Sequence, residues 1–323
     1  MPTGHAANLL RFPVREADPH AQYRRAIVAA VSKLDGITAE TVRAFGKDLR
    51  GLRGDVLRIM AEQPSRAAAV YQTLDRVGGA VDQWTAGGAV HLRGGMDAAE
   101  ERARTLTGEW VERVGVFSNG AITPTEIGGV PGGLVGVGRD NIEALKVAAG
   151  EHIVEVGTAI KRRVASQARA AALGLISPQE AMSEIGQFIR PIRVPIVRAG
   201  EVVGHRYVGA LARAEQIART EIGRAYTTAS QYQQDEIAER VPELLKQWIP
   251  VVDTHTRSSH AAMVGDKAIR PVKEPYTVGG AELMYPVDFN GPAREVVNCR
   301  CVSVPMFPKQ KRQAPVVADP GKG

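Results

Sequence analysis

The stretch that decides the fold class is "ALARAEQIARTEIGRAYTTASQYQQDEIAE" at residues 210–239, followed at 244–253 by "LLKQWIPVVD". Apolar residues in the first segment recur every three or four positions, which predicts one long amphipathic helix. Its expected buried stripe consists of Leu211, Ala214, Ala218, Ile222, Ala225 and Ala229. The second segment has the pattern of a strand. A helix followed by strands predicts an α+β fold for this part of the chain.

The segments around this stretch extend the prediction. Downstream, "ELMYPVDF" at 282–289 and "EVVNCRCVSVPMF" at 295–307 are predicted strands. We expect the long helix to pack on a small, mainly antiparallel sheet that includes residues 246–252 and 295–304. Upstream, residues 190–209 alternate apolar and polar side chains around a turn, which predicts a short hairpin that its prolines restrict to a sheet edge.

Residues 140–189 predict a helical hairpin with a tight turn at Gly174. Its first helix has an apolar stripe of Ile142, Leu145, Ala149, Ile153, Val156, Ile160 and Val164. The second helix has a clear start, because Ser177 can cap it, Pro178 suits the first helical position, and Glu180 lies three residues after the cap.

The first 139 residues have helical composition interrupted by glycines. The glycine-rich segment 78–95 separates predicted helices at 64–78 and 96–114. No phosphate-loop spacing fits residues 115–138, which favour a flexible connector or an extended packing segment. The sequence therefore predicts four parts: an N-terminal helical and glycine-rich region (1–139), a helical hairpin (140–189), a C-terminal α+β domain (190–308) and a disordered tail (309–323).

The composition is that of a soluble globular protein, with 44% hydrophobic and 24% charged residues among 323. No apolar run approaches the roughly 18 residues that a membrane helix needs, and the N-terminus lacks a secretory signal. Two cysteines cannot form a disulfide framework, which indicates a reducing compartment. A net charge of +6 permits contact with nucleic acid without arguing for it.

Polar residues that could carry chemistry lie in four short segments: "IARTE" at 217–221, "DTHTRSSH" at 253–260, "YPVDF" at 285–289 and "NCRC" at 298–301. A small sheet packed on one helix brings its strand ends together. We therefore expect a convergent polar network of Arg219, Glu221, Asp253, Arg257 and His260, with Cys299 or Cys301 at its edge.

The two cysteines allow three interpretations. Two apart on a strand, Cys299 and Cys301 would share a face, where they could be buried small hydrophobic residues. They could also form half of a zinc site that His260 and either His255 or Asp253 would complete. A strained disulfide is the third interpretation. Because structural zinc sites usually draw their cysteines from CxxC turns, we favour the first interpretation and expect no cofactor, with zinc as the alternative.

The same clusters also allow an enzyme. His260 could act as a general base, Arg257 or Arg300 could stabilise developing charge, and the set would suit a small metal-independent RNase. The simpler interpretation is a buried hydrogen-bond network that fastens helix to sheet. No Ser-His-Asp pattern stands out, so we expect no catalytic residues, with a nuclease or metal-dependent enzyme built on His260, Arg257 and Asp253 as the alternative.

The order of these segments resembles the phage Mu protein F-like family of minor head, or head morphogenesis, proteins of tailed phages and prophages. The resemblance covers about residues 165–305. The motif residues are Arg219, Thr220, Glu221, Trp248, Asp253, Arg257, His260, Tyr285, Pro286, Asp288, Asn298, Cys299, Arg300 and Cys301. The hairpin at 190–209 departs from the family pattern as an apparent insertion, and the first 140 residues match no pattern that we can name.

The resemblance implies a structural protein of the virion, in the capsid interior near the portal, that passes through the host cytoplasm during assembly. It implies the portal protein and other head proteins as partners, packaged DNA as a further candidate, and an influence on packaging or ejection. Some relatives carry a toxin or nuclease domain after this one. Because the sequence ends shortly after Cys301, we expect no such domain here.

Overall fold

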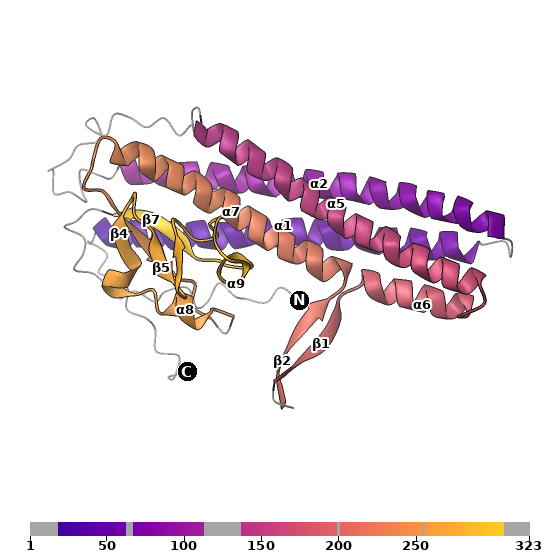
Figure 1. Ribbon diagram of the computed structural model, residues 1–323. Coiled ribbons are helices and arrows are strands. Elements are labelled where there is room, and N and C mark those ends of the chain that lie inside the picture. Colours follow the sequence, from indigo (N-terminus) through magenta and orange to yellow (C-terminus); the bar gives the residue numbers. More distant parts are fainter. Residues whose placement is uncertain (1–18, 63–66, 113–136, 199–200, 254, 307–323) are drawn as a thin grey trace. The chain divides into compact units, whose positions relative to one another are not determined.

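The computed structural model describes residues 19–62, 67–112, 137–198, 201–253 and 255–306. Long helices make up the N-terminal and middle parts and small antiparallel sheets follow, which confirms the predicted α+β class (Figure 1). The long helices are α1 (Pro19–Ala61), α2 (Ala67–Glu112), α5 (Val137–Ala172) and α7 (Ala210–Ala238).

Two compact units share these helices. One comprises residues 1–37, 96–145 and 220–323, and the other residues 38–95 and 146–219. The connector predicted at 115–138 and the tail lie largely outside the described residues.

Helices α1 and α2 correct the prediction that glycines interrupt this region. Residues 78–95, expected to separate two helices, lie inside the continuous α2. Each glycine costs a helix roughly 0.5–1 kcal/mol relative to alanine, so packing must compensate. In the second unit, a Cβ on Gly157 of α5 would lie 2.3 Å from the Thr85 Cγ2 of α2, and one on Gly88 would lie 3.0 Å from the Ile153 Cγ2. Some glycines are therefore points of close helix approach.

The helical hairpin at 140–189 matches its local signals. Helix α5 ends before a turn at Gly174, whose φ of +72° costs a glycine no steric strain. Helix α6 (Pro178–Ile189) begins at Ser177, whose Oγ accepts a hydrogen bond from the Glu180 amide at 3.1 Å. The predicted β-hairpin is also present, as antiparallel strands β1 (Ile192–Arg198) and β2 (Glu201–Val208) with an irregular register between Ile196 and Val197.

The C-terminal part contains a three-stranded antiparallel sheet in the order β4-β3-β7. Its strands are β3 (Leu245–Ile249), β4 (Ile269–Pro271) and β7 (Val302–Met306). A second hairpin pairs β5 (Tyr276–Val278) with β6 (Ala281–Leu283), and short helical turns are α8 (Ser258–Ala261), η2 (Gly265–Ala268) and α9 (Ala293–Val296). Helix α7 is fastened to this part by Ser230, which donates to the Ser303 carbonyl at 3.3 Å, and by Gln231, which donates to the Val272 carbonyl at 3.2 Å.

The expected strand at 295–307 is only partly correct. Strand β7 pairs with β3 as predicted, but α9 replaces the start of the strand, and both cysteines lie between α9 and β7. Between α9 and β7, Asn298 has a left-handed φ of +59°, which a continuous strand does not allow. Asparagine adopts this conformation more readily than most residues. The expected strand at 282–289 similarly stops at Leu283, and Val287 has a φ of +61°.

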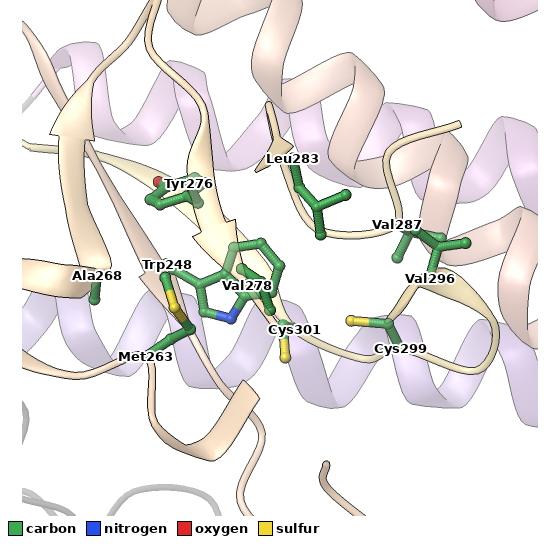
Figure 2. Packing of buried hydrophobic residues seen from close by; sticks show 10 residues of the cluster. All are labelled: Trp248, Met263, Ala268, Tyr276, Val278, Leu283, Val287, Val296, Cys299 and Cys301. Carbon is green, nitrogen blue, oxygen red and sulfur yellow. The ribbon is translucent and has the colours of Figure 1, made fainter. Parts of the chain in front are cut away.

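A buried apolar cluster centres on Trp248 of β3 (Figure 2). Its members come from β3, β5, β6, η2, the segment around α9 and the α8–η2 connection. They are Trp248, Met263, Ala268, Tyr276, Val278, Leu283, Val287, Val296, Cys299 and Cys301. The cysteines are therefore part of the core of this region, and Figure 2 shows the Cys299 sulfur directed toward the Cys301 side chain.

Candidate metal centre and surrounding polar network

Cys299, Cys301 and His260 form one buried cluster. The His260 Nδ1 lies 3.5 Å from the Cys299 Sγ and 3.4 Å from the Cys301 Sγ. The three ligand atoms all lie within 4.8 Å of one another. The structure thus brings together the three residues that the sequence offered as metal ligands, although the cysteines occupy a turn rather than the expected strand.

The other side of the His260 ring contacts a buried carboxylate. The Nε2 of His260 lies 3.1 Å from the Glu295 Oε2, which also accepts a hydrogen bond from the Ser259 Oγ at 2.9 Å. The indole of Trp248 packs edge-to-face against the imidazole, with ring centroids 5.5 Å apart. A Cβ on Gly279 would lie 2.3 Å from the Glu295 Oε1, so this glycine leaves room for the carboxylate. The imidazole is therefore fixed in position and orientation.

The pKa values of the two thiols shift in opposite directions. A hydrogen bond from the neighbouring Cys299 thiol, with further help from His260, lowers the pKa of Cys301 below its ordinary value despite burial. The interaction with Cys301 and burial raise the pKa of Cys299. Loss of a proton from the pair is therefore easier at Cys301 than at Cys299.

The turn that presents the cysteines is fastened by two motif residues. Thr220 of α7 accepts a hydrogen bond at its Oγ1 from the Asn298 amide at 3.1 Å. The guanidinium of Arg257 donates to the Val297 carbonyl. These contacts hold Asn298, the left-handed residue directly before Cys299, in place. The "ARTE", "RSSH" and "NCRC" segments therefore all contribute to the structure of this turn.

Asp253 is engaged by Arg300, which lies between the two cysteines. Burial raises the pKa of Asp253, but hydrogen bonds from Arg300 and from the His255 amide outweigh it and hold the pKa below its ordinary value. The His255 side chain is exposed. Asp253 and His255 are the sequence's candidates for a fourth zinc ligand, and neither belongs to the cluster of ligand atoms from His260, Cys299 and Cys301.

The remaining network residues have separate partners. Arg224 forms a two-contact ion pair with Glu221, at 2.8 and 2.6 Å, and its Nε donates to the Val287 carbonyl at 3.3 Å. Arg219, expected to reach the network, instead donates to Glu215 on an exposed face of its own helix at 3.3 Å. Asp288 closes the turn after β6 by accepting hydrogen bonds from the Met284 and Asn290 amides at 2.8 and 2.9 Å.

The sequence did not predict the contacts of two polar residues, Glu295 and Lys246, although Lys246 fits the Lys-x-Trp strand motif of the resemblance. Glu295, the partner of His260, lay within the expected strand, and its acidic side chain four residues before Cys299 was the available signal. Lys246 is fully buried in β3, where its Nζ donates to the Met284 carbonyl at 2.6 Å and lies 5.1 Å from the centre of the Tyr276 ring. Burial lowers the pKa of Lys246 to about 8.

A curated enzyme is similar to part of this chain. An NAD(+)–arginine ADP-ribosyltransferase, EFV, of Enterococcus faecalis is 36% identical over 92 residues, which are 28% of this chain and 18% of that enzyme. The chain therefore spans less than a fifth of the length of that enzyme. No solved structure matches. Among the described helices, none combines the length and apolar character that crossing a bilayer requires.

The family comparison agrees with the resemblance in the motif segments. Residues 144–304 match the family described as "Phage Mu protein F like protein", a range that includes α7, the Trp248 core and all the motif residues. Through these residues, the chain belongs to the phage Mu protein F-like family.

Proposed function

We propose that this chain is a minor head protein of a tailed phage or prophage, which binds the portal region in the capsid interior and acts in head assembly without catalysis. The family match over residues 144–304 carries the proposal, since membership suggests a phage head morphogenesis protein. Other head proteins are its expected partners, with the portal protein first among them, and packaged DNA is a further candidate.

The motif residues are buried or hydrogen-bonded to other parts of the protein, which supports a structural role. His260 is only 2% exposed, one ring nitrogen contacts Glu295, and the other faces the thiols. A general base must come within hydrogen-bond reach of the proton that it removes, and a phosphodiester cannot reach a nitrogen placed in this way. Arg257 is likewise occupied by the Val297 carbonyl, and Asp253 by Arg300. These contacts favour a network that holds the turn before β7 over the nuclease alternative.

The β1–β2 hairpin supplies a surface for a partner. Its exposed apolar side chains are Ile196, Val197, Val202 and Tyr207. A two-stranded hairpin is marginally stable by itself, and apolar side chains grouped on one exposed element are typical of protein contacts. We assign this hairpin as a surface that contacts the portal protein.

Coexpression with the portal protein of the same phage or prophage tests the proposal. The two proteins should purify together and remain associated at moderate salt, because apolar contacts are little screened. A variant carrying Val197→Thr, Val202→Thr and Tyr207→Ser should fold normally and lose most of this association. Tyr71→Ser, which alters an even more exposed tyrosine on α2, should leave it intact. Association unaffected by the triple variant would exclude the hairpin as the contact surface, and no association of the parent protein would exclude portal binding.

Activity assays test the absence of catalysis. The purified protein should leave DNA and RNA intact, with or without divalent metal, and should transfer no label from NAD+ to an arginine-containing acceptor. Cleavage that disappears in His260→Ala would establish the nuclease alternative in place of a purely structural role.

A further inference from the structure

We propose that the His260 Nδ1, the Cys299 Sγ and the Cys301 Sγ bind a zinc ion. These atoms are the ligand set of a Cys2His site, and they come from two separate segments, α8 and the turn between α9 and β7. A solvent molecule would take the fourth position, because no further His, Cys, Asp or Glu of the described residues joins the cluster. This site is independent of portal binding.

The distances fit a tetrahedral zinc site. With Zn–S and Zn–N bonds of about 2.3 and 2.0–2.1 Å, the edge between a sulfur and a nitrogen ligand of a tetrahedron is about 3.5 Å long. The two sulfur-to-Nδ1 distances are 3.5 and 3.4 Å. Two edges of one face of such a tetrahedron are thus already present, and the two sulfur atoms that form the third lie within 4.8 Å of each other.

Hydrogen bonding alone accounts poorly for this arrangement. An imidazole nitrogen carries either one hydrogen or one lone pair, directed in the plane of the ring, so it forms one well-aligned hydrogen bond. Here two sulfur atoms approach the same Nδ1 at nearly equal distances. A cation placed between the three atoms satisfies all of them at once, with both cysteines as thiolates whose protons are released on binding.

The surroundings of His260 resemble the outer shell of a metal site. A histidine that ligates a metal almost always contacts a carboxylate, carbonyl or water through its other nitrogen, which fixes the ring and raises its basicity. The Nε2 of His260 contacts the buried carboxylate of Glu295, which is itself held by the Ser259 hydroxyl. Thiolate and imidazole ligands select zinc over the oxygen-preferring magnesium and calcium ions.

The test measures metal in the full-length, tag-free protein, purified under reducing conditions. Zinc should be retained at one ion per chain after gel filtration. Replacement by Co²⁺ should give a thiolate-to-cobalt charge-transfer absorption, and X-ray absorption should show two sulfur ligands and at least one nitrogen ligand. A folded parent protein with two free thiols that takes up neither zinc nor cobalt would overturn the proposal, and so would a protein whose cysteines stay joined in a disulfide resistant to reduction.

Variants locate the ion. Cys299→Ser, Cys301→Ser and His260→Gln should each abolish stoichiometric zinc, whereas the matched control His255→Gln, at an exposed histidine nearby in sequence, should retain it. Glu295→Gln should retain the site and weaken zinc affinity about 10- to 100-fold. Zinc that persists at one ion per chain in Cys301→Ser would place the ion elsewhere. Because the cobalt spectrum uses the parent protein, the proposal stays testable even where a variant does not fold.

Discussion

Lys246 places a positive charge inside the C-terminal core, where charge is costly. Burial lowers its pKa from an ordinary value of 10.5 to about 8, so between these values the folded protein binds fewer protons than the unfolded chain. The penalty is fully present below about pH 8 and is relieved as the pH rises. Relative to Lys246→Met, which has no charge to titrate, the parent should therefore gain up to roughly 3 kcal/mol of stability on going from about pH 7 to above pH 10.

Urea unfolding of both proteins across this pH range measures the effect. Groups common to the two proteins cancel in the difference, so only the contribution of residue 246 remains. Stability curves that run parallel with pH would show that Lys246 keeps its ordinary pKa in the folded protein.

Arg224 and Arg219 make a matched pair of arginines on α7. Arg224→Ala leaves the Glu221 carboxylate buried without its partner, which should cost about 3–5 kcal/mol. Arg219→Ala removes only an exposed contact with Glu215 and should cost about 0–1 kcal/mol. Chemical denaturation of both variants provides the measurement. Equal losses of stability would mean that the network extends to Arg219, as the sequence predicted.

At the scale of elements, the close approach of α2 and α5 can be tested at two glycines of α5. Alanine at Gly157 would meet Thr85, so Gly157→Ala should destabilise the protein by about 1–3 kcal/mol. At Gly150 the nearest atom to a new Cβ is 3.9 Å away, so Gly150→Ala should stabilise the helix by up to about 1 kcal/mol. Thermal unfolding distinguishes the two variants, and a stabilising Gly157→Ala would contradict the packing.

The elements also show what the sequence could predict. The start of α6 at Ser177 and the β1–β2 hairpin were predictable because their signals are local. The continuity of α2 was not, since the close packing of Gly88 against Ile153 of α5 joins residues far apart in sequence. The turn at Asn298 was missed because a left-handed residue interrupts an apparently extended pattern without a glycine. The role of Glu295 could not be predicted from local sequence signals either, because its contact with His260 joins residues 35 positions apart.

At the scale of the whole molecule, the motif segments that identify the family are joined by structural contacts. Thr220, Arg257 and Asn298 lie far apart in sequence yet meet at the turn before the cysteines. This explains why the segments occur together in a protein for which we propose no catalysis. A head protein without catalytic activity acts at the place where it assembles, so the proposed function depends on its location in the phage head.

The most direct test is quantitative mass spectrometry of heads purified from cells that express the complete set of head genes, with and without the portal gene. We predict that this chain is present in a few copies in heads that contain the portal protein, and absent from heads assembled without it. Absence from portal-containing heads, or equal amounts in both preparations, would contradict the proposed function.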